Sequence, residues 1–291
     1  MVTGATGKVG GAVISLLAAD PSIELVAAVR SPAKLRDRGI AVVRLDYDRI
    51  ETLAQALTGV DRVLMLTGYT VDMFAQSKAF INEAKRVGVQ FIVHLGACGD
   101  DDTKVAHWGW QQFVERYIEW AGFSSTHLRP DIFMQNLLGY GGARVVVDGV
   151  VRHYVGGARI SWVDCDDVAA VAAACLRHPE LHAGKTYRLP SDAKSFDEIA
   201  EILSRTIGLP FSYEPRPPEE FLELVLAAGA DPAYMRSAYE NYAAYTAGTV
   251  PEPGADFATM AAIIRRKGVT WKEFALKHAG QLRYRWSKPA P

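Results

Sequence analysis

The chain has 291 residues, enough for a doubly wound sheet with a smaller lobe or for two modest domains. Its 32 Lys and Arg residues balance 33 Asp and Glu residues. Because no block of basic residues stands out, the sequence gives little support to a nucleic-acid surface.

The three cysteines, Cys98, Cys165 and Cys175, are widely spaced. They fit neither a disulfide framework nor a zinc motif, so we expect buried thiols in a reducing compartment and no metal. The sequence has no charged leader followed by an apolar core, and no apolar run long enough to cross a bilayer. These features predict a cytoplasmic protein that does not bind membranes.

The first half of the chain alternates short runs of Val, Ile and Leu with amphipathic stretches that end at turn signals. This alternation implies right-handed crossovers and a parallel sheet with helices on both faces. Only residues 1–3 precede the first turn, which is short for a central strand. The further expected strands are 23–29, 41–45, 60–66, 89–95 and 125–128, and the expected helices are 9–19, 50–57, 71–87 and 105–121.

The rhythm changes after Pro130, where glycines and an alternating stretch at 145–151 precede an expected strand at 159–163 and a helix at 166–176. Short strands near Thr186 and Phe211 and helices at 218–228 and 232–247 follow. We therefore expect an α/β protein with a Rossmann-type doubly wound parallel sheet and a smaller C-terminal α/β lobe. The expected division is 1–130, with 158–182 returning to it, against a substrate-binding lobe of 131–157 and 183–291.

A glycine turn with the pattern Gly-x-x-Gly-x-x-Gly opens the first helix. A strand that turns this tightly into a helix points backbone amides at a pyrophosphate, and the third glycine lets the helix pack closely. The pattern alone is weak evidence, but its position between a strand and a helix predicts a dinucleotide site. The residues expected there are Gly4, Thr6, Gly7, Lys8, Val9 and Gly10.

The end of the second strand indicates which dinucleotide binds. NAD enzymes place a carboxylate there to hold the ribose 2′-hydroxyl, but this strand ends Val29-Arg30 with no acid. Arg30 and Lys34 stand where a 2′-phosphate would lie, so NADP(H) is favoured over NAD(H). The alternative is that Arg30 only faces solvent.

Further cofactor contacts are expected where later strands end. Asp46 could bind the adenine amino group and the ring of Tyr47 could pack on the base; alternatively, Asp46 caps the following helix. The other residues expected at the cofactor are Thr67, Gly68, Gly96 and Ala97.

Several segments, in order along most of the chain, resemble the NmrA-like branch of the short-chain dehydrogenase/reductase superfamily. They include Val2-Thr3-Gly4-Ala5-Thr6-Gly7, Val29-Arg30-Ser31-Pro32, Leu45-Asp46-Tyr47-Asp48, Leu128-Arg129-Pro130, Phe133-Met134-Gln135-Asn136 and Ile160-Ser161-Trp162-Val163-Asp164. The resemblance implies a Rossmann domain, a C-terminal substrate lobe and a cleft between them. It does not imply a reaction, because this branch contains both reductases and NADP-sensing regulators.

The usual catalytic pair of short-chain dehydrogenases, a Tyr four residues before a Lys, is missing. At the corresponding stretch the chain has His107 and Gln111. His107 could donate a proton in place of the Tyr, or it could only cap or pack. The spacing of five residues predicts core positions on the same helix: Trp110, Phe113, Val114, Tyr117 and Ile118.

The substrate side is expected to be apolar and aromatic, which suits a planar acceptor. The candidate pocket residues are Cys98, Trp108, Gln111, Phe133, Asn136 and Tyr140. We therefore expect an NADPH-dependent reductase of a small quinone, dye, enone or carbonyl, with a non-catalytic NADP(H) sensor as the alternative. The expected partner is a small-molecule substrate, with no nucleic acid and no membrane, and a homodimer is left open.

Overall fold

The computed structural model describes residues 1–35, 39–139, 145–250 and 256–286, except for the side chains of Lys34, Arg285 and Trp286. The chain divides into two compact units. Unit 1 comprises Met1–Pro130 and Cys165–Leu189, and unit 2 comprises Asp131–Asp164 and Pro190–Pro291.

Unit 1 contains a parallel sheet in the order β2, β1, residue Val2, β3, β4, β5 and β10. Val2 bridges Ala27 of β1 and Leu64 of β3, so the short first segment takes the central place. Its amide donates to the carbonyl of Val26, and its carbonyl accepts from the amide of Ala28. The strands are β1 (Val26–Val29), β2 (Ala41–Arg44), β3 (Arg62–Leu66), β4 (Phe91–Leu95), β5 (Ser124–Pro130) and β10 (Lys185–Leu189).

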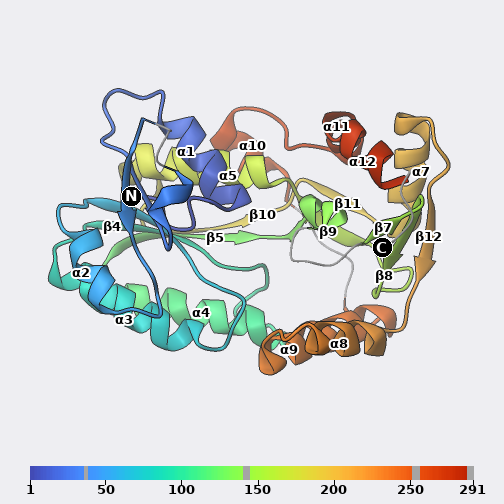
Figure 1. Cartoon of the computed structure of the whole chain (residues 1–291), viewed down its shortest axis with the longest axis horizontal. Helices are drawn as coiled ribbons and strands as arrows, with labels where there is room; N and C mark the ends of the chain where they lie inside the picture. Colours follow the sequence, from blue (N-terminus) through green and yellow to red (C-terminus); the bar gives the residue numbers. More distant parts are fainter. Residues whose placement is uncertain (36–38, 140–144, 251–255, 287–291) are drawn as a thin grey trace. The chain divides into compact units, whose positions relative to one another are not determined.

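Helices cover both faces of this sheet (Figure 1). α1 (Lys8–Leu17) packs with α5 (Cys165–Arg177) on one face, and α2 (Glu51–Leu57), α3 (Met73–Arg86) and α4 (Ala106–Trp120) lie on the other. The short segments η1 (Pro32–Lys34) and α6 (Pro179–His182) complete the unit. The predicted Rossmann-type α/β fold is therefore confirmed.

Unit 2 is built on two small sheets. In one, β9 (Ile160–Val163) pairs with β6 (Ile132–Phe133) and β11 (Asp192–Lys194). In the other, β8 (Val150–His153) pairs with β7 (Val146–Val147) and β12 (Ser212–Pro215). Its helices are η2 (Met134–Leu138), α7 (Phe196–Ile207), α8 (Pro218–Ala227), α9 (Pro232–Thr246), α10 (Ala258–Ile264), α11 (Trp271–Lys277) and α12 (Ala279–Trp286).

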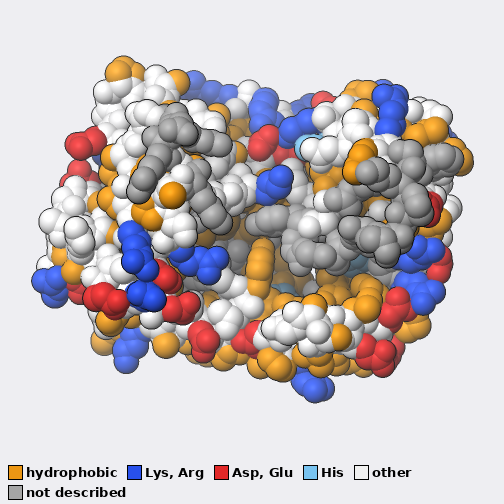
Figure 2. Space-filling model, in the orientation of Figure 1, with side chains coloured by type: hydrophobic (Ala, Val, Ile, Leu, Met, Phe, Trp, Pro, Cys, Tyr) orange, Lys and Arg blue, Asp and Glu red, His pale blue; other side chains and the backbone are white. Residues whose placement is uncertain are grey.

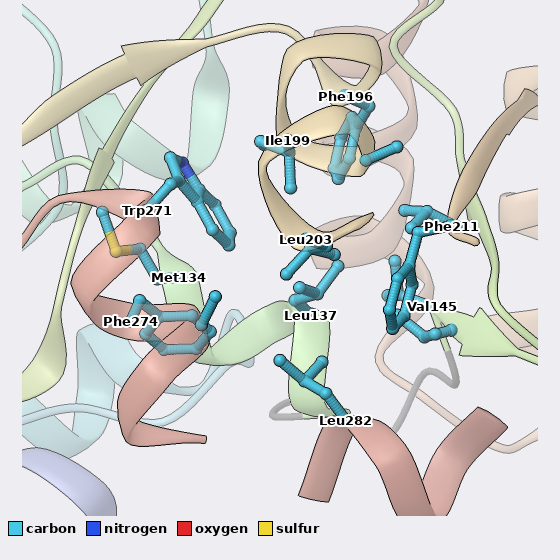
Figure 3. Close-up of a cluster of buried hydrophobic side chains, with 14 of the residues drawn as sticks. Met134, Leu137, Val145, Phe196, Ile199, Leu203, Phe211, Trp271, Phe274 and Leu282 are labelled. Carbon is cyan, nitrogen blue, oxygen red and sulfur yellow. The ribbon is translucent and has the colours of Figure 1, made fainter. Parts of the chain in front are cut away.

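Unit 2 has its own hydrophobic core, in which side chains from α7, α11 and the η2 segment converge (Figure 3). Trp271 and Phe274 are fully buried, and Trp162 stands edge-on to both Trp271 and Phe196. A separate core of this kind indicates a unit that can hold its own shape.

The boundaries of the units differ from those expected at two segments. The strand at 160–163 lies in unit 2, because it pairs with β6 and β11. The segment 183–189 lies in unit 1, because β10 extends the parallel sheet beside β5. Both segments were placed by their rhythm along the chain, which does not reveal pairing partners.

The described residues include no helix that is both long and apolar enough to cross a membrane. On the face drawn in Figure 2, Lys and Arg side chains are interspersed with Asp and Glu side chains, consistent with a formal net charge of −1.

Candidate cofactor and active site

The glycine turn has the close packing expected of a phosphate-binding turn. Gly4 has a φ of +59°, which favours glycine. A Cβ added to Gly10 would lie 2.3 Å from the carbonyl oxygen of Gly4. Helix α1 therefore approaches the first strand more closely than any side chain at position 10 would allow.

The N-terminus of α1 is free of side-chain caps. Gly7 is the N-cap residue and no acidic residue lies in the first turn. Thr6 and Lys8 are exposed beside it, while Val9 is buried beneath. The amides of this helix end and the positive end of its dipole are thus left for an anion, which fits the pyrophosphate of a dinucleotide.

Arg30 is exposed and comes directly after β1. The structure gives its side chain no acidic partner among the described ion pairs, and the segment that follows is η1. The Lys34 side chain lies outside the described residues. Of the two cations expected at a 2′-phosphate, Arg30 is therefore the one whose side chain the structure describes.

Asp46 and Tyr47 are oriented by local contacts. The carboxylate of Asp46 accepts from the amide of Asp48 at 3.2 Å, and α2 begins after Ile50 without a side-chain cap. Asp46 is therefore not the cap of α2. The ring of Tyr47 packs on Phe80 at a centroid distance of 5.3 Å, and burial raises the pKa of its hydroxyl. This ring is partly buried against the core of unit 1, and its packing on adenine stays a prediction.

Three of the expected residues meet where β3 and β4 end. Gln111 of α4 donates from Nε2 to Oγ1 of Thr67 at 2.9 Å. A Cβ added to Gly96 would lie 3.5 Å from the Cβ of Gln111, so these residues are close neighbours. Gly68 is exposed, Ala97 is partly exposed and Cys98 is buried with 7% of its surface exposed.

The first turn of α4 carries the residues considered for catalysis. His107 and Gln111 are one helical turn apart, as the catalytic pair would be. His107 is half-buried, and burial lowers the pKa of its imidazole to about 4. At neutral pH it is therefore uncharged and poorly suited to deliver a proton. Trp108 lies against Gly99, where an added Cβ would be 3.0 Å from its ring.

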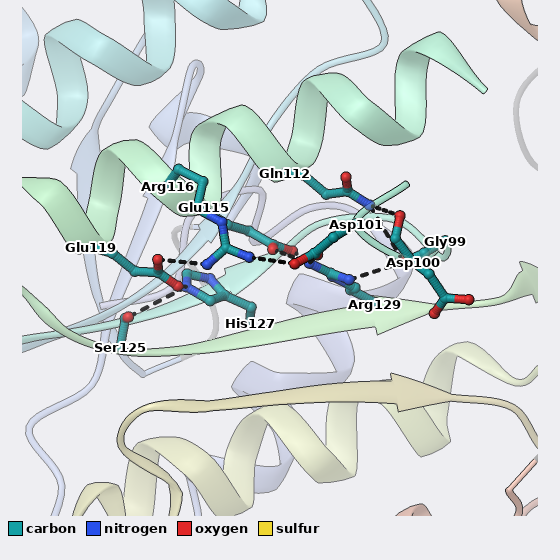
Figure 4. Close-up of polar contacts among 10 residues, drawn as sticks. All are labelled: Gly99, Asp100, Asp101, Gln112, Glu115, Arg116, Glu119, Ser125, His127 and Arg129. Carbon is teal, nitrogen blue, oxygen red and sulfur yellow. Dashed lines mark hydrogen bonds and ion pairs between the residues drawn. The ribbon is translucent and has the colours of Figure 1, made fainter. Parts of the chain in front are cut away.

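A buried ion pair joins α4 to β5, and the sequence analysis did not predict it (Figure 4). Arg129 of β5 donates from Nε and Nη2 to the two oxygens of Glu115 of α4, at 3.0 and 2.6 Å. The Glu115 side chain is 1% exposed and that of Arg129 is 9% exposed. The only sequence signal was Glu115 on the inward face of α4, three residues before Ile118.

The same guanidinium holds the loop that follows β4. Arg129 donates from Nη1 to the carbonyl of Gly99 at 3.0 Å and from Nη2 to Asp101 at 2.8 Å. Gln112 of α4 also donates to the carbonyl of Asp100 at 2.8 Å. The pKa of Asp101 is lowered mainly by its hydrogen bond from Arg129. Arg129 and Glu115 are thus positioning residues for the loop that contains Cys98 and Gly99.

His94 and His127 lie close to this pair and could suggest a metal site. Ligand atoms of His94, Glu115 and His127 lie within 4.8 Å of one another. However, Arg129 occupies both oxygens of Glu115, so a divalent cation would have to displace a guanidinium. Burial and, to a smaller extent, the neighbouring His127 lower the pKa of His94 to about 3. The arrangement favours the ion pair with a neutral His94 over a bound metal.

Phe133 and Asn136 belong to unit 2, at β6 and η2, and both are partly exposed. Tyr140 lies outside the described residues. These candidates for the substrate pocket are therefore carried by the second unit, whereas His107, Trp108 and Gln111 are carried by the first.

The parallel sheet, the close-packed glycine turn and the uncapped α1 together define a Rossmann-type protein with a turn of the kind that holds a dinucleotide. A model of the NmrA-like family matches residues 1–274. The chain belongs to the NmrA-like family, as its motifs predicted.

Three of the similar proteins are named as reductases or oxidoreductases. An NAD(P)H azoreductase from Xenophilus azovorans is 30% identical, covering 96% of this chain and 97% of its own. Quinone oxidoreductase 2 from Escherichia coli is 31% identical over 78% of this chain and 81% of its own. The crystal structure of Citrobacter sp. triphenylmethane reductase complexed with NADP(H) aligns with a TM-score of 0.80 and 26% identity, covering 96% of this chain and 99% of that one.

Proposed function

We propose that this protein is an NADPH-dependent reductase of a small apolar or aromatic acceptor such as a quinone, an azo or triphenylmethane dye, or an enone. The names of its relatives support a nicotinamide-dependent reduction of acceptors of this kind. The uncapped N-terminus of α1 and the glycines at positions 4 and 10 would hold the pyrophosphate. Exposed Arg30 would bind the 2′-phosphate.

One observation carries the choice of acceptor. The helix that normally provides an acid and its activating cation has the neutral His107 and the amide Gln111 in their place. Bound NADPH supplies a hydride, and the protein then needs only to orient the acceptor and exclude competing water. An acceptor whose reduced anion is stable can take its proton from solvent, whereas a simple ketone needs an acid at the moment of transfer. Quinones and conjugated dyes meet this condition.

In this proposal each residue has a limited task. Gln111 fixes Thr67 at the carboxyl end of β3, and Arg129 with Glu115 fixes the loop after β4. Trp108 and Cys98 of unit 1 would line the acceptor side. We also propose Phe133 and Asn136 as substrate contacts and unit 2 as a substrate-binding lobe. We also propose that the protein acts in the cytoplasm on small molecules rather than on nucleic acid, which its balanced charge supports.

The test is NADPH oxidation with a panel of quinones, azo dyes, triphenylmethane dyes, enones and simple ketones. We expect turnover with the first four classes and little with ketones. His107→Phe should retain turnover within about tenfold, because water provides the proton. Tight NADPH binding without turnover of any acceptor would instead favour the NADP(H) sensor. Loss of turnover in His107→Phe with intact binding would identify His107 as the acid.

A further inference from the structure

Helix α4 has two apolar faces, and its own unit covers the second of them only in part, through Trp110 and Tyr117. The inward face buries Val114 and Ile118 against the sheet. The second face carries four aromatic residues at intervals of three, four and three, and Phe74 of α3 lies beside them. We call this set the aromatic seam, and it consists of Trp110, Phe113, Tyr117 and Trp120 together with Phe74.

Three rings of the aromatic seam are exposed, among them Phe113, for which the sequence pattern predicted a core position. Trp110 and Tyr117 are partly buried. Phe113 is 68% exposed, Trp120 is 79% exposed and Phe74 is 36% exposed. The rings form two contacting groups that follow one another along α4. Phe74 lies 6.1 Å from Trp110 and 6.3 Å from Phe113, and Tyr117 lies 5.5 Å from Trp120, measured between ring centroids. A contiguous exposed apolar surface of this kind marks an interface, whereas isolated exposed aromatics do not.

The spacing of the aromatic residues indicates that a helix packs on the aromatic seam. Apolar residues at intervals of three and four form the stripe with which one helix packs on another. The order along α4 is also symmetric about residue 115. Trp110 and Trp120 are equally distant from that point, and so are Phe113 and Tyr117.

We propose that the aromatic seam binds the same seam of a second copy of this chain, with the two α4 helices antiparallel about a two-fold axis near residue 115. In this arrangement Trp110 packs on the partner's Trp120, and Phe113 packs on the partner's Tyr117. The interface is isologous, so one patch that complements itself is sufficient.

The polar groups at the seam suit burial against an identical surface. Arg116, at its rim, already pairs with Glu119 of the same helix at 2.7 Å, so two copies bring no unbalanced charge together. The hydroxyl of Tyr117 donates to Asn82 at 2.8 Å, so burying its ring leaves no unbonded donor. A partner of strongly acidic or basic character would find no complementary charge there.

The exposed rings supply more than half of the area that a dimer needs. An aromatic side chain offers about 200 Å², and the exposed fractions of Phe74, Phe113 and Trp120 then leave roughly 370 Å² open in one chain. Two copies would bury about twice this area from these three rings alone. The neighbouring side chains then have to add only several hundred Å² to reach the lower limit of a specific interface, about 1,200 Å².

The first test is the mass of the full chain in solution, measured by sedimentation equilibrium over a range of concentrations. We expect a dimer for the wild type, and a rise of at least about a hundredfold in the dimer dissociation constant for Phe113→Glu, because a charge would be buried at the centre of the seam. The control is Ile50→Glu, which alters a side chain of unit 1 that is 65% exposed and outside the seam. Wild-type protein that remains monomeric, or an equal effect of both changes, would overturn the proposal.

The second test checks the antiparallel register. Phe113→Asp and Tyr117→Lys should each be monomeric alone, while their mixture should form heterodimers because positions 113 and 117 meet across the axis. A mixture that stays monomeric while the wild type is dimeric would refute this register. Far-ultraviolet circular dichroism verifies that each variant is folded, and NADPH titration of Phe113→Glu separates loss of the dimer from loss of cofactor binding.

Discussion

Glu115→Ala tests the buried ion pair beneath the ligand edge. The change removes the carboxylate that accepts two hydrogen bonds from Arg129, at 3.0 and 2.6 Å. The guanidinium stays charged at every working pH, and its side chain is only 9% exposed. Its remaining partners are the carbonyl of Gly99 and the carboxylate of Asp101.

The magnitude follows from burial. Asp101 is 67% exposed, so solvent weakens its compensation of the charge. Removing one partner of a buried ion pair typically costs about 3 to 5 kcal/mol, because the other charge is left uncompensated. For a unit of this size we expect the melting temperature to fall by roughly 10 °C. The loop after β4 should also lose its anchor, so turnover should fall with stability.

The assay is urea unfolding followed by circular dichroism, with Arg116→Ala as the matched control. Arg116 also pairs with Asp101, but its side chain is 53% exposed, so its removal should cost no more than about 1 kcal/mol. The double variant Glu115→Leu, Arg129→Met should recover much of the loss, because no charge remains buried. Equal free energies of unfolding for Glu115→Ala and Arg116→Ala would refute the reasoning.

Three further predictions concern the cofactor and the buried histidines. NADPH should bind at least about tenfold more tightly than NADH, and Arg30→Ala but not Arg205→Ala should abolish the difference; identical titration curves of the wild type with both cofactors would contradict this. Gly7→Val should abolish binding in a folded protein, whereas Gly157→Val, where an added Cβ meets nothing within 4 Å, should not; unchanged affinity in Gly7→Val would place the phosphate elsewhere. Burial lowers the pKa of His94 and of His153 to about 3, so below pH about 6.5 the unfolded chain binds protons that the folded chain does not. The free energy of unfolding is therefore retained above that pH and lost below it, by about 1.4 kcal/mol per pH unit for each histidine. In urea titrations, the free energy of unfolding of His94→Leu should depend less steeply on pH than that of the wild type. An unchanged slope would argue against a neutral His94.

The sheet of unit 1 could be predicted because its signals are local. Short apolar runs and helical periods lie close to the elements that form, and most ends agree within three residues, as for α3 at Met73–Arg86. The glycine turn could also be predicted from the sequence, since its spacing reflects the contact between Gly10 and Gly4. These features depend on residues near one another in sequence.

What could not be predicted depends on pairing at a distance. The bond between Glu115 and Arg129 needs the register of α4 against β5, and the unit boundary needs the partners of β9 and β10. Phe113 shows a further limit. Periodicity finds an apolar stripe on a helix, but it does not say which of two stripes meets the sheet, and Phe113 proves to be 68% exposed.

The buried charge of Arg129 restricts which residues can stand at position 111, now occupied by Gln111. Its side chain is 6% exposed, and Gly96 brings it into the same small space as His94 and Glu115. A lysine at this position would add an ammonium group to an interior that already contains the guanidinium of Arg129, with Glu115 fully engaged. The two cations would repel each other strongly in a dry interior, and one engaged carboxylate would not balance both. The chain is therefore expected to resist introduction of a Tyr-x-x-x-Lys pair by His107→Tyr and Gln111→Lys unless Arg129 is neutralised at the same time. Acid catalysis of that kind would thus require three coordinated changes.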